Sequence, residues 1–158
     1  EEAFHIAADA GLGVTIHAGA AYGPASIREA IHRCGARRLG HGTRLAEDPV
    51  LAQYVNDFRI PIEVCLTSNV QTRVARDYAD HPLRRLYDDG VVVTLCTDNR
   101  MMSATTVTDE YVHARDAFGF AWDELCDLAL MGFEAAFLPH ADKVDLIERV
   151  GAEIEALG

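Results

Sequence analysis

Two patterns of apolar positions alternate along this chain, short apolar runs and apolar residues at helical spacing. Short apolar runs at 12–17, 60–66 and 91–96 predict strands, and the shorter segment 38–41 is counted as a fourth. The run at 91–96 is nearly continuous in apolar and β-branched residues, which predicts a strand buried on both faces. Apolar residues at helical spacing predict helices over 1–10, from Pro24, Pro49 and Pro82 onward, and over 106–118, 121–137 and 141–157.

The order of these elements predicts the fold class. A first helix is followed by four strand-helix units and then by further helices, and such alternation predicts an α/β fold with four parallel strands joined by right-handed crossovers. We expect one domain over 1–158, with the strand-helix units in 1–105 and a helical carboxyl-terminal part in 106–158. The last two helices are expected to act as scaffolding that buries Leu125, Leu128, Phe133 and Ile147.

Residues that can carry chemistry stand at the carboxyl end of every predicted strand, namely His17, His41, Ser68 with Asn69, and Asp98. The carboxyl ends of parallel strands meet at one rim, where α/β proteins keep their sites. Each residue alone has an ordinary explanation, such as a hydrogen-bonded core histidine or an aspartate that caps the next helix. Together, however, they predict a site. The other histidines are expected to lie away from the rim: His5, His32, His81, His113 and His140.

A divalent metal fits the residue types at this rim. Neutral imidazole and carboxylate suit zinc, and a catalytic zinc has three or more protein ligands plus a water. His17 and Asp98 are the expected ligands, while His41 is either a third ligand or a base that orients the attacking water. The glycines on either side of His41 are expected to give its backbone room to approach something. The side chains that follow the third strand orient these groups or make ordinary turn hydrogen bonds: Ser68, Asn69 and Gln71.

Composition narrows the classes of partner. The 158 residues are 49% hydrophobic and carry a formal net charge of −11, which argues against nucleic acid and allows a neutral or cationic small molecule, although solubility explains the charge as well. No apolar run approaches the roughly 18 residues of a membrane span. The amino end shows no signal-peptide pattern, and the cysteines form no C-x-x-C pair, with Cys65 and Cys96 inside strand-like runs. We therefore expect a cytoplasmic protein with reduced cysteines.

Several motifs, in order, resemble those of the adenosine deaminase family. They are Thr15-Ile-His17-Ala-Gly, Leu39-Gly40-His41-Gly42, the segment from Glu63 to Thr72, Cys96-Thr-Asp98-Asn99 and Phe137-Leu138-Pro139. The Cys-Leu-Thr-Ser-Asn-x-Gln-Thr part resembles bacterial adenosine deaminases more than the related adenine deaminases. The resemblance implies a metal-dependent-hydrolase type (β/α)8 TIM barrel that binds zinc and hydrolyses adenosine to inosine and ammonia in purine metabolism. It makes His17 and Asp98 zinc ligands, and His41 the histidine beside the metal-bound water.

Two positions depart from the family's pattern. The family's His-Ala-Gly is followed by a glutamate that protonates the purine ring, but Ala20 stands there and cannot carry a proton. General acid catalysis is worth about 10²–10⁴-fold, so impaired activity is expected. Asn99 replaces an aspartate that contacts the purine in many members, and its amide can still make a substrate hydrogen bond.

The resemblance begins in the middle of the family's barrel. The early His-x-His pair of zinc ligands and the glycine-bearing nucleoside loop are absent from these residues. Four strands cannot close an eight-stranded barrel, and an open half-barrel is expected to leave two strand edges and an apolar interior in water. We expect the chain to be the carboxyl half of a longer protein, or to be completed by a second copy or by a separate amino-terminal half.

Three hypotheses for function follow. The leading one is zinc-dependent hydrolytic deamination of adenosine, impaired here by Ala20. The second is a catalytically silent protein that binds a nucleoside or assembles with an active subunit. The third is deamination of another aminopurine, such as an aminated futalosine.

Overall fold

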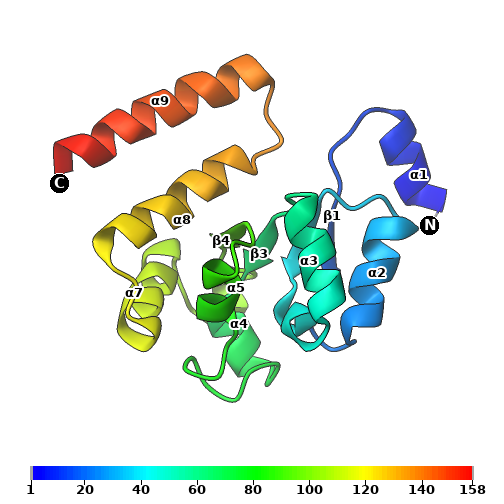
Figure 1. Cartoon of the computed structure of the whole chain (residues 1–158), viewed down its shortest axis with the longest axis horizontal. Helices are drawn as coiled ribbons and strands as arrows, with labels where there is room; N and C mark the ends of the chain where they lie inside the picture. Colours follow the sequence, from blue (N-terminus) through cyan, green and yellow to red (C-terminus); the bar gives the residue numbers. More distant parts are fainter. Residues whose placement is uncertain (1, 158) are drawn as a thin grey trace.

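The computed structural model describes residues 2–157, and its four strands form one parallel sheet in sequence order (Figure 1). The strands are β1 (Thr15–Ala18), β2 (Arg38–His41), β3 (Ile62–Val64) and β4 (Val93–Leu95). The order β1-β2-β3-β4 places β1 and β4 at the two edges. The predicted α/β class with four parallel strands is confirmed.

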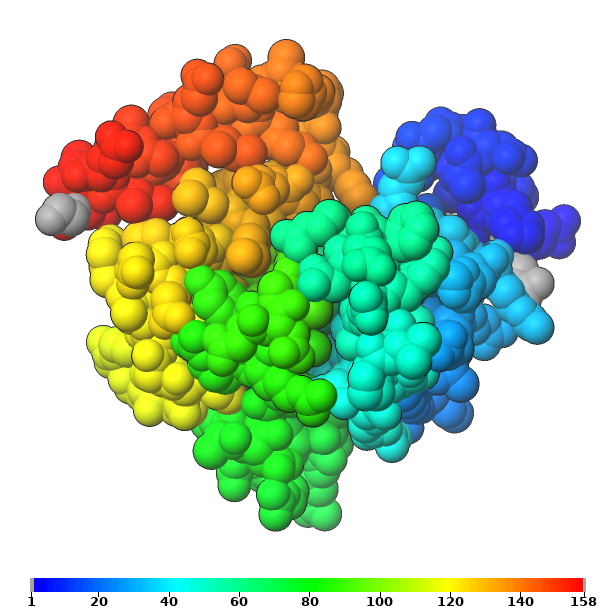
Figure 2. All heavy atoms as spheres, in the orientation of Figure 1, coloured from blue at the N-terminus to red at the C-terminus, as the bar shows by residue number. Residues whose placement is uncertain are grey.

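Helices follow every strand and also fill both ends of the chain. They are α1 (Glu2–Asp9), α2 (Pro24–His32), the 3₁₀ helix η1 (Thr43–Glu47), α3 (Pro49–Asp57), α4 (Leu66–Gln71), α5 (Leu83–Asp88), α6 (Arg100–Ser103), α7 (Val107–Phe118), α8 (Trp122–Glu134) and α9 (His140–Leu157). In Figure 2, α1 and α9 stand out as separate projections from the body that the strand-helix units form. None of the helices within 2–157 has the length and apolarity that crossing a membrane requires.

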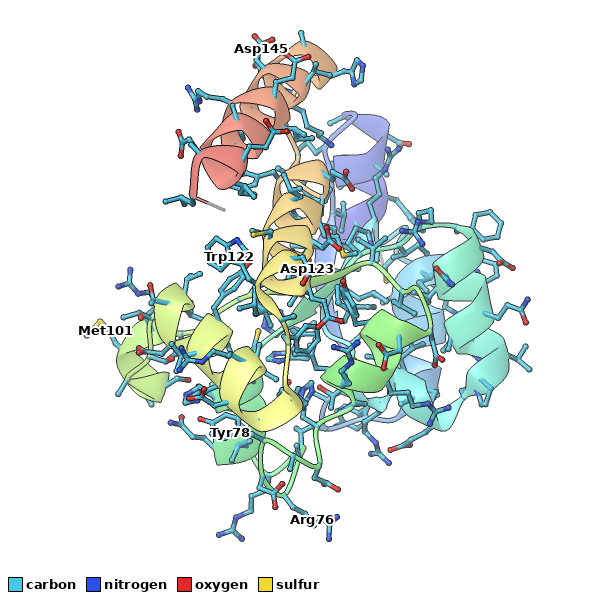
Figure 3. The ribbon with its side chains drawn as sticks, turned by 60° about the vertical axis from the view of Figure 1, so that its left-hand side comes forward. Arg76, Tyr78, Met101, Trp122, Asp123 and Asp145 are labelled. Carbon is cyan, nitrogen blue, oxygen red and sulfur yellow. The ribbon has the colours of Figure 1, made fainter. Side chains whose placement is uncertain are left out.

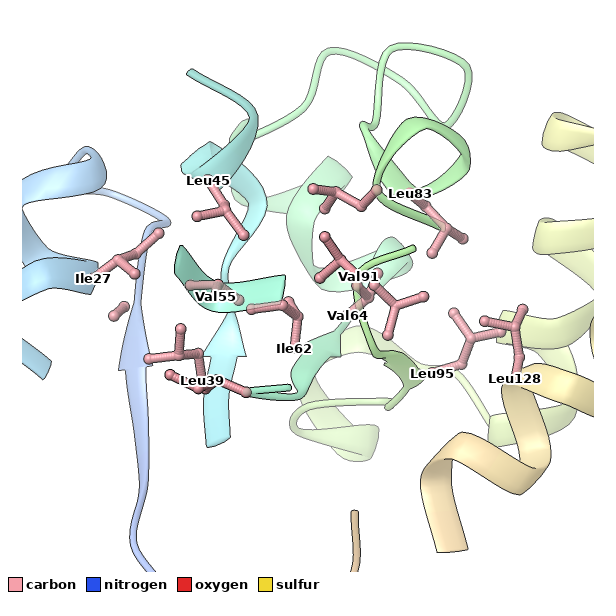
Figure 4. Packing of buried hydrophobic residues seen from close by; sticks show 14 of the residues in the cluster. Ile27, Leu39, Leu45, Val55, Ile62, Val64, Leu83, Val91, Leu95 and Leu128 are labelled. Atoms are coloured by element: carbon pink, nitrogen blue, oxygen red, sulfur yellow. The ribbon is translucent and has the colours of Figure 1, made fainter. Parts of the chain in front are cut away.

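The main core lies between one face of the sheet and the helices (Figure 4). Alternate strand residues point to this face, and Leu39, Ile62 and Val64 are fully buried there. They meet buried residues of the covering helices, which include Ile27, Leu45, Leu51, Val55, Leu83 and Leu128. Each such side chain contributes about 1.5–3 kcal/mol by leaving water. Of the four scaffolding residues expected in the last two helices, Leu128 alone is fully buried.

The opposite face of the sheet is polar, so the expectation of an apolar interior was wrong. Thr15 donates to Oε2 of Glu63 over 2.8 Å, and Nε of Arg38 lies 2.9 Å from Oε1 of Glu63. The Arg38 guanidinium lies 3.7 Å from the ring centroid of Phe137, which belongs to the segment between α8 and α9. A Cβ on Gly13 would lie 2.6 Å from that ring. Polar pairing makes this face tolerant of water, unlike the core face.

The segment after the third strand, for which no helix was predicted, is mostly helical, as α4. Asn69 N donates to Cys65 O over 2.8 Å. The N–H of Thr67 donates to the buried carboxylate of Glu110 on α7 over 3.2 Å. A carboxylate at a helix N-terminus is favourable because it meets unpaired N–H groups and the positive end of the helix dipole. Glu110 lies 43 residues away in sequence, so local composition could not reveal this helix.

Candidate metal and catalytic site

Three predicted residues meet at the carboxyl edge of the sheet. His17 lies in β1, His41 ends β2, and Asp98 follows β4, and one ligand atom from each lies within 4.8 Å of the others. The His17 and His41 ring centroids are 4.8 Å apart, and Nε2 of His41 is 3.8 Å from Oδ2 of Asp98. His41 is buried, whereas His17 and Asp98 are exposed. The register explains this meeting, because β1 pairs with β2 through Ala18 and His41.

Two of these residues have an unusual backbone conformation. His41 has φ of 67° and Asp98 has φ of 56°, both in the left-handed region. Residues other than glycine pay for such a conformation, typically about 1–3 kcal/mol where the surroundings enforce it, and such residues cluster at functional sites. The cap of the following helix is Asn99, whose Oδ1 accepts from Met102 N over 3.0 Å. The alternative explanation of Asp98 as a helix cap was therefore wrong.

The glycines beside His41 make room for the protein itself. A Cβ on Gly42, at φ of 58°, would lie 2.6 Å from Cγ2 of Ile62, and a Cβ on Gly40 would lie 3.4 Å from the His17 ring. The room that the flanking glycines were expected to give this backbone is used for close approach to Ile62 and His17. Their effect is to let His41 turn sharply at the end of β2.

Two side chains of helix α4 form hydrogen bonds with Asp98 and His41. Ser68 Oγ donates to Oδ2 of Asp98 over 2.8 Å, and Nδ2 of Asn69 lies 3.1 Å from Nδ1 of His41. These bonds match the orienting role that was one of two interpretations for Ser68 and Asn69. Gln71 instead donates to the backbone oxygen of Ser103 over 2.9 Å, and so it ties α4 to α6.

His81 was missed as part of this arrangement. Its Nε2 lies 3.0 Å from Oδ1 of Asn69, and the ring is 3% exposed, so the expectation that it lies apart from the rim residues was wrong. Burial lowers its pKa to about 4. The only signal in the sequence is a histidine directly before the proline that precedes α5, and this pattern carries no specific chemistry.

The electrostatics of the site keep His41 neutral near pH 7. Burial and the neighbouring His17 lower the pKa of His41, and the carboxylates of Asp98 and Glu63 oppose this only in part. A neutral imidazole can bind a metal, donate or accept one hydrogen bond at each nitrogen, or receive a proton.

A cavity of about 510 Å³ opens beside these residues. Its lining includes His41, Ser68, Asp98 and Ala20, so Ala20 borders the same space as the candidate catalytic groups. This volume lies in the usual range for small-molecule sites. Asn99 directly follows Asp98, which lines the cavity, but Asn99 itself is not among the lining residues. Its contact with substrate therefore stays a prediction.

Comparisons with known proteins agree on one family. The family described as "Adenosine deaminase" matches residues 1–153. Adenosine deaminase of Klebsiella pneumoniae subsp. pneumoniae is 42% identical over 147 residues, which are 93% of this chain and 44% of that protein. Two crystal structures have the same fold. Adenine deaminase of Arthrobacter aurescens has a TM-score of 0.92 at 28% identity, over 98% of this chain and 47% of that one. Arabidopsis ADAL complexed with IMP has a TM-score of 0.85 at 27% identity, over 96% of this chain and 44% of that one. The chain thus spans less than half the length of each.

Proposed function

Because this chain belongs to the adenosine deaminase family, we propose that it supplies the carboxyl-terminal half of a TIM-barrel hydrolase that converts adenosine and water to inosine and ammonia. The family is one of hydrolases, and the four-stranded sheet is part of its α/β barrel. The observation that carries the proposal is the convergence of His17, His41 and Asp98 within 4.8 Å beside a cavity of ligand size.

The donor set fits zinc. Two imidazoles and a carboxylate are ligands that zinc accepts, and their atoms are close enough to share one ion after small movements. His17 and Asp98 are the residues proposed to hold it, and when bound it supplies an acidified water at neutral pH. With two ligands from this chain, affinity should fall well below that of a complete site. Retention of stoichiometric zinc by the chain through exhaustive dialysis contradicts this expectation.

Three further residues of the chain have proposed roles in the reaction or its impairment. His41 lines the cavity next to Asp98 and can orient the attacking water or manage its proton. Ser68 keeps the Asp98 carboxylate in place through its hydrogen bond. Ala20 stands where the family's general acid is expected and has no proton to give, so the chain should be impaired by about 10²–10⁴-fold or more even when the barrel is complete.

The decisive experiment restores the acid. The chain is fused to the amino-terminal half of the Klebsiella relative, and Ala20→Glu is compared with Ala21→Glu, since both alanines line the cavity. We expect Ala20→Glu alone to raise the conversion of adenosine to inosine, followed by the ultraviolet change from adenine to hypoxanthine. A folded, zinc-loaded Ala20→Glu fusion with no such change contradicts the proposal.

Ala20 also favours a second candidate function, a silent protein that binds the nucleoside without turnover or assembles with an active subunit. Titration calorimetry of the unmodified fusion with adenosine and inosine distinguishes the two. Binding without turnover, combined with no gain from Ala20→Glu, supports the silent protein.

Deamination of another aminopurine is the remaining alternative. The Arabidopsis neighbour was solved with IMP, a purine nucleotide rather than a nucleoside. Assays of the Ala20→Glu fusion on adenosine, adenine and AMP under identical conditions rank these substrates. The fused segment supplies the other strands of the barrel in this proposal, so the test measures the preference of the assembled barrel.

Completion of the barrel is a proposal that the two sheet edges support. Large exposed apolar side chains follow both edge strands in sequence: Tyr22 after β1 is 80% exposed, and Met101 (Figure 3) and Met102 after β4 are 92% and 80% exposed. Open strand edges and exposed apolar residues of this kind suit contact with an amino-terminal half or with a second copy. Native mass spectrometry of the chain, alone and with a separately expressed amino-terminal half, tests this. We place the reaction in the cytoplasm, where the four free cysteines stay reduced.

A further inference from the structure

A backbone amide sets the direction of the hydrogen bonds behind His41. The N–H of Leu83 donates to Nδ1 of His81 over 3.1 Å, and a backbone N–H can only donate. Nδ1 of His81 therefore carries no proton, and in a neutral ring the proton lies on Nε2. The ring is 3% exposed, and burial keeps it neutral at pH 7.

The proton on His81 decides how the Asn69 amide is turned. Nε2 of His81 needs an acceptor, and the atom 3.0 Å away is Oδ1 of Asn69. The Thr43 hydroxyl donates to the same oxygen, also over 3.0 Å. The amide nitrogen of Asn69 therefore points to the other side, where it donates to Nδ1 of His41 over 3.1 Å. All four side chains are at most 7% exposed, so bulk water does not compete for these bonds.

We propose that His81, acting through Asn69, is a positioning residue that holds His41 as the tautomer with its proton on Nε2. Nδ1 of His41 must accept from Asn69, which leaves the neutral ring with an N–H at Nε2. That nitrogen is on the side of Asp98, whose Oδ2 is 3.8 Å away. His41 thus presents a hydrogen-bond donor to the Asp98 side of the site.

This tautomer separates the roles that the sequence left open for His41. Nε2 with a proton has no lone pair with which to ligate a metal or to take a proton from water. Ligation through Nε2 requires a proton on Nδ1, and that proton would face the N–H of Asn69. His41 is therefore a donor that holds an oxygen atom in the site, and His17 with Asp98 remain the metal ligands from this chain. The catalytic meaning rests on the proposed function, whereas the hydrogen bonds belong to the chain itself.

Nitrogen NMR tests the tautomer without metal or substrate. Long-range ¹H–¹⁵N spectra of the 158-residue chain at mildly alkaline pH separate protonated from bare ring nitrogens, and a His41→Gln variant assigns the His41 signals. We expect a protonated Nε2 in the unmodified chain. His81→Leu removes the donor to Asn69 and should give a mixture of tautomers, whereas His81→Gln, whose amide can still donate, should preserve the original one. His140→Gln, an exposed histidine on α9, serves as the control.

A variant of Asn69 gives a second test of the His41 tautomer. Asn69→Asp places an acceptor opposite Nδ1 and should move the His41 proton there, which provides a readout even where His81→Leu does not fold. A protonated Nδ1 in the unmodified chain, or an unchanged tautomer in a folded His81→Leu chain, overturns the assignment.

The catalytic consequence has its own measurement. In the Ala20→Glu fusion, His81→Leu should lower kcat about 10–100-fold with little change in KM, and His81→Gln should restore most of it. An unaltered kcat in a folded His81→Leu fusion refutes the positioning role. If the fusion shows no deamination while the tautomer shifts as expected, the proposed function fails and the assignment of the His41 tautomer stands.

Discussion

Ser68 donates a hydrogen bond of 2.8 Å from its Oγ to Oδ2 of Asp98. The donor lies in the first turn of α4, after β3, and the acceptor follows β4, so one bond joins the segments that follow two adjacent strands. Asp98 is otherwise exposed and has a left-handed backbone, and Ser68 limits where its carboxylate can go.

Loss of this bond should weaken metal binding. Ser68→Ala is expected to reduce zinc affinity about 10–100-fold, because the Asp98 carboxylate then loses its orienting partner. Zinc titration against a chelating indicator measures the change. Ser103→Ala, at a buried serine on α6 outside the cavity lining, should leave the affinity as it was. Equal affinities in the two variants would show that Ser68 does not orient a ligand.

Gly42→Ala should destabilise the chain more than Gly35→Ala. Both glycines have left-handed φ, 58° and 65°, so an alanine at either costs about 1–2 kcal/mol from the backbone. Gly35 has nothing within 4 Å of an added Cβ, whereas at Gly42 that carbon would lie 2.6 Å from Ile62. The overlap should add about 1–3 kcal/mol, measured as the difference between the two urea midpoints at constant slope. Matching midpoints would mean that the chain relaxes around Ile62 without cost.

Glu110→Gln should loosen α4. Glu110 is fully buried, and its two oxygens accept from Thr67 N over 3.2 Å and from Thr105 Oγ1 over 2.9 Å. An amide has one oxygen fewer, so a donor is left unpaired and the free energy of unfolding should fall by about 1–3 kcal/mol. Zinc affinity should fall with it, because α4 carries Ser68. Glu148→Gln, at an exposed glutamate on α9, is the control, and a Glu110→Gln chain as stable as that control contradicts the prediction.

Stability should fall between pH 6.5 and about 4 because His81 is buried. Its pKa drops from 6.5 to about 4, lowered by burial and by His41 against the opposing charge of Asp80. The unfolded chain therefore binds more protons in this window, so the full stability is present above pH 6.5 and about 3 kcal/mol is lost as pH falls through the folded pKa. Unfolding free energies of His81→Leu across this window should show a smaller slope, because only the share of His41, whose pKa is also lowered, remains, and His140→Gln should keep the full slope. The same slope in both variants would assign it to other groups.

The strands and helices followed closely from periodicity. A strand covered on both faces leaves a nearly continuous apolar run, which is why the strand that ends at Leu95 was visible in the sequence. The boundaries agreed less well, since β3 spans Ile62–Val64 rather than the whole run 60–66. Helix α4 escaped prediction because its polar residues are paired with partners far along the chain, such as Glu110 with Thr67.

Part of the candidate site could also be predicted from the sequence. Pattern alone placed His17, His41 and Asp98 on one rim, because the carboxyl ends of parallel strands must lie at the same edge of a sheet. Motif resemblance then marked Ala20 as the position of a missing acid, and the cavity beside Asp98 includes it.

Other features depended on the folded chain. The polar inner face, the cap at Asn99 and the bonds from Leu83 through His81 and Asn69 to His41 exist only once distant segments meet. Periodicity records which side of an element is buried, because burial of apolar area is additive and non-directional. Hydrogen bonds are directional and pair single atoms across long stretches of chain, so they leave no repeating trace in the order of residues.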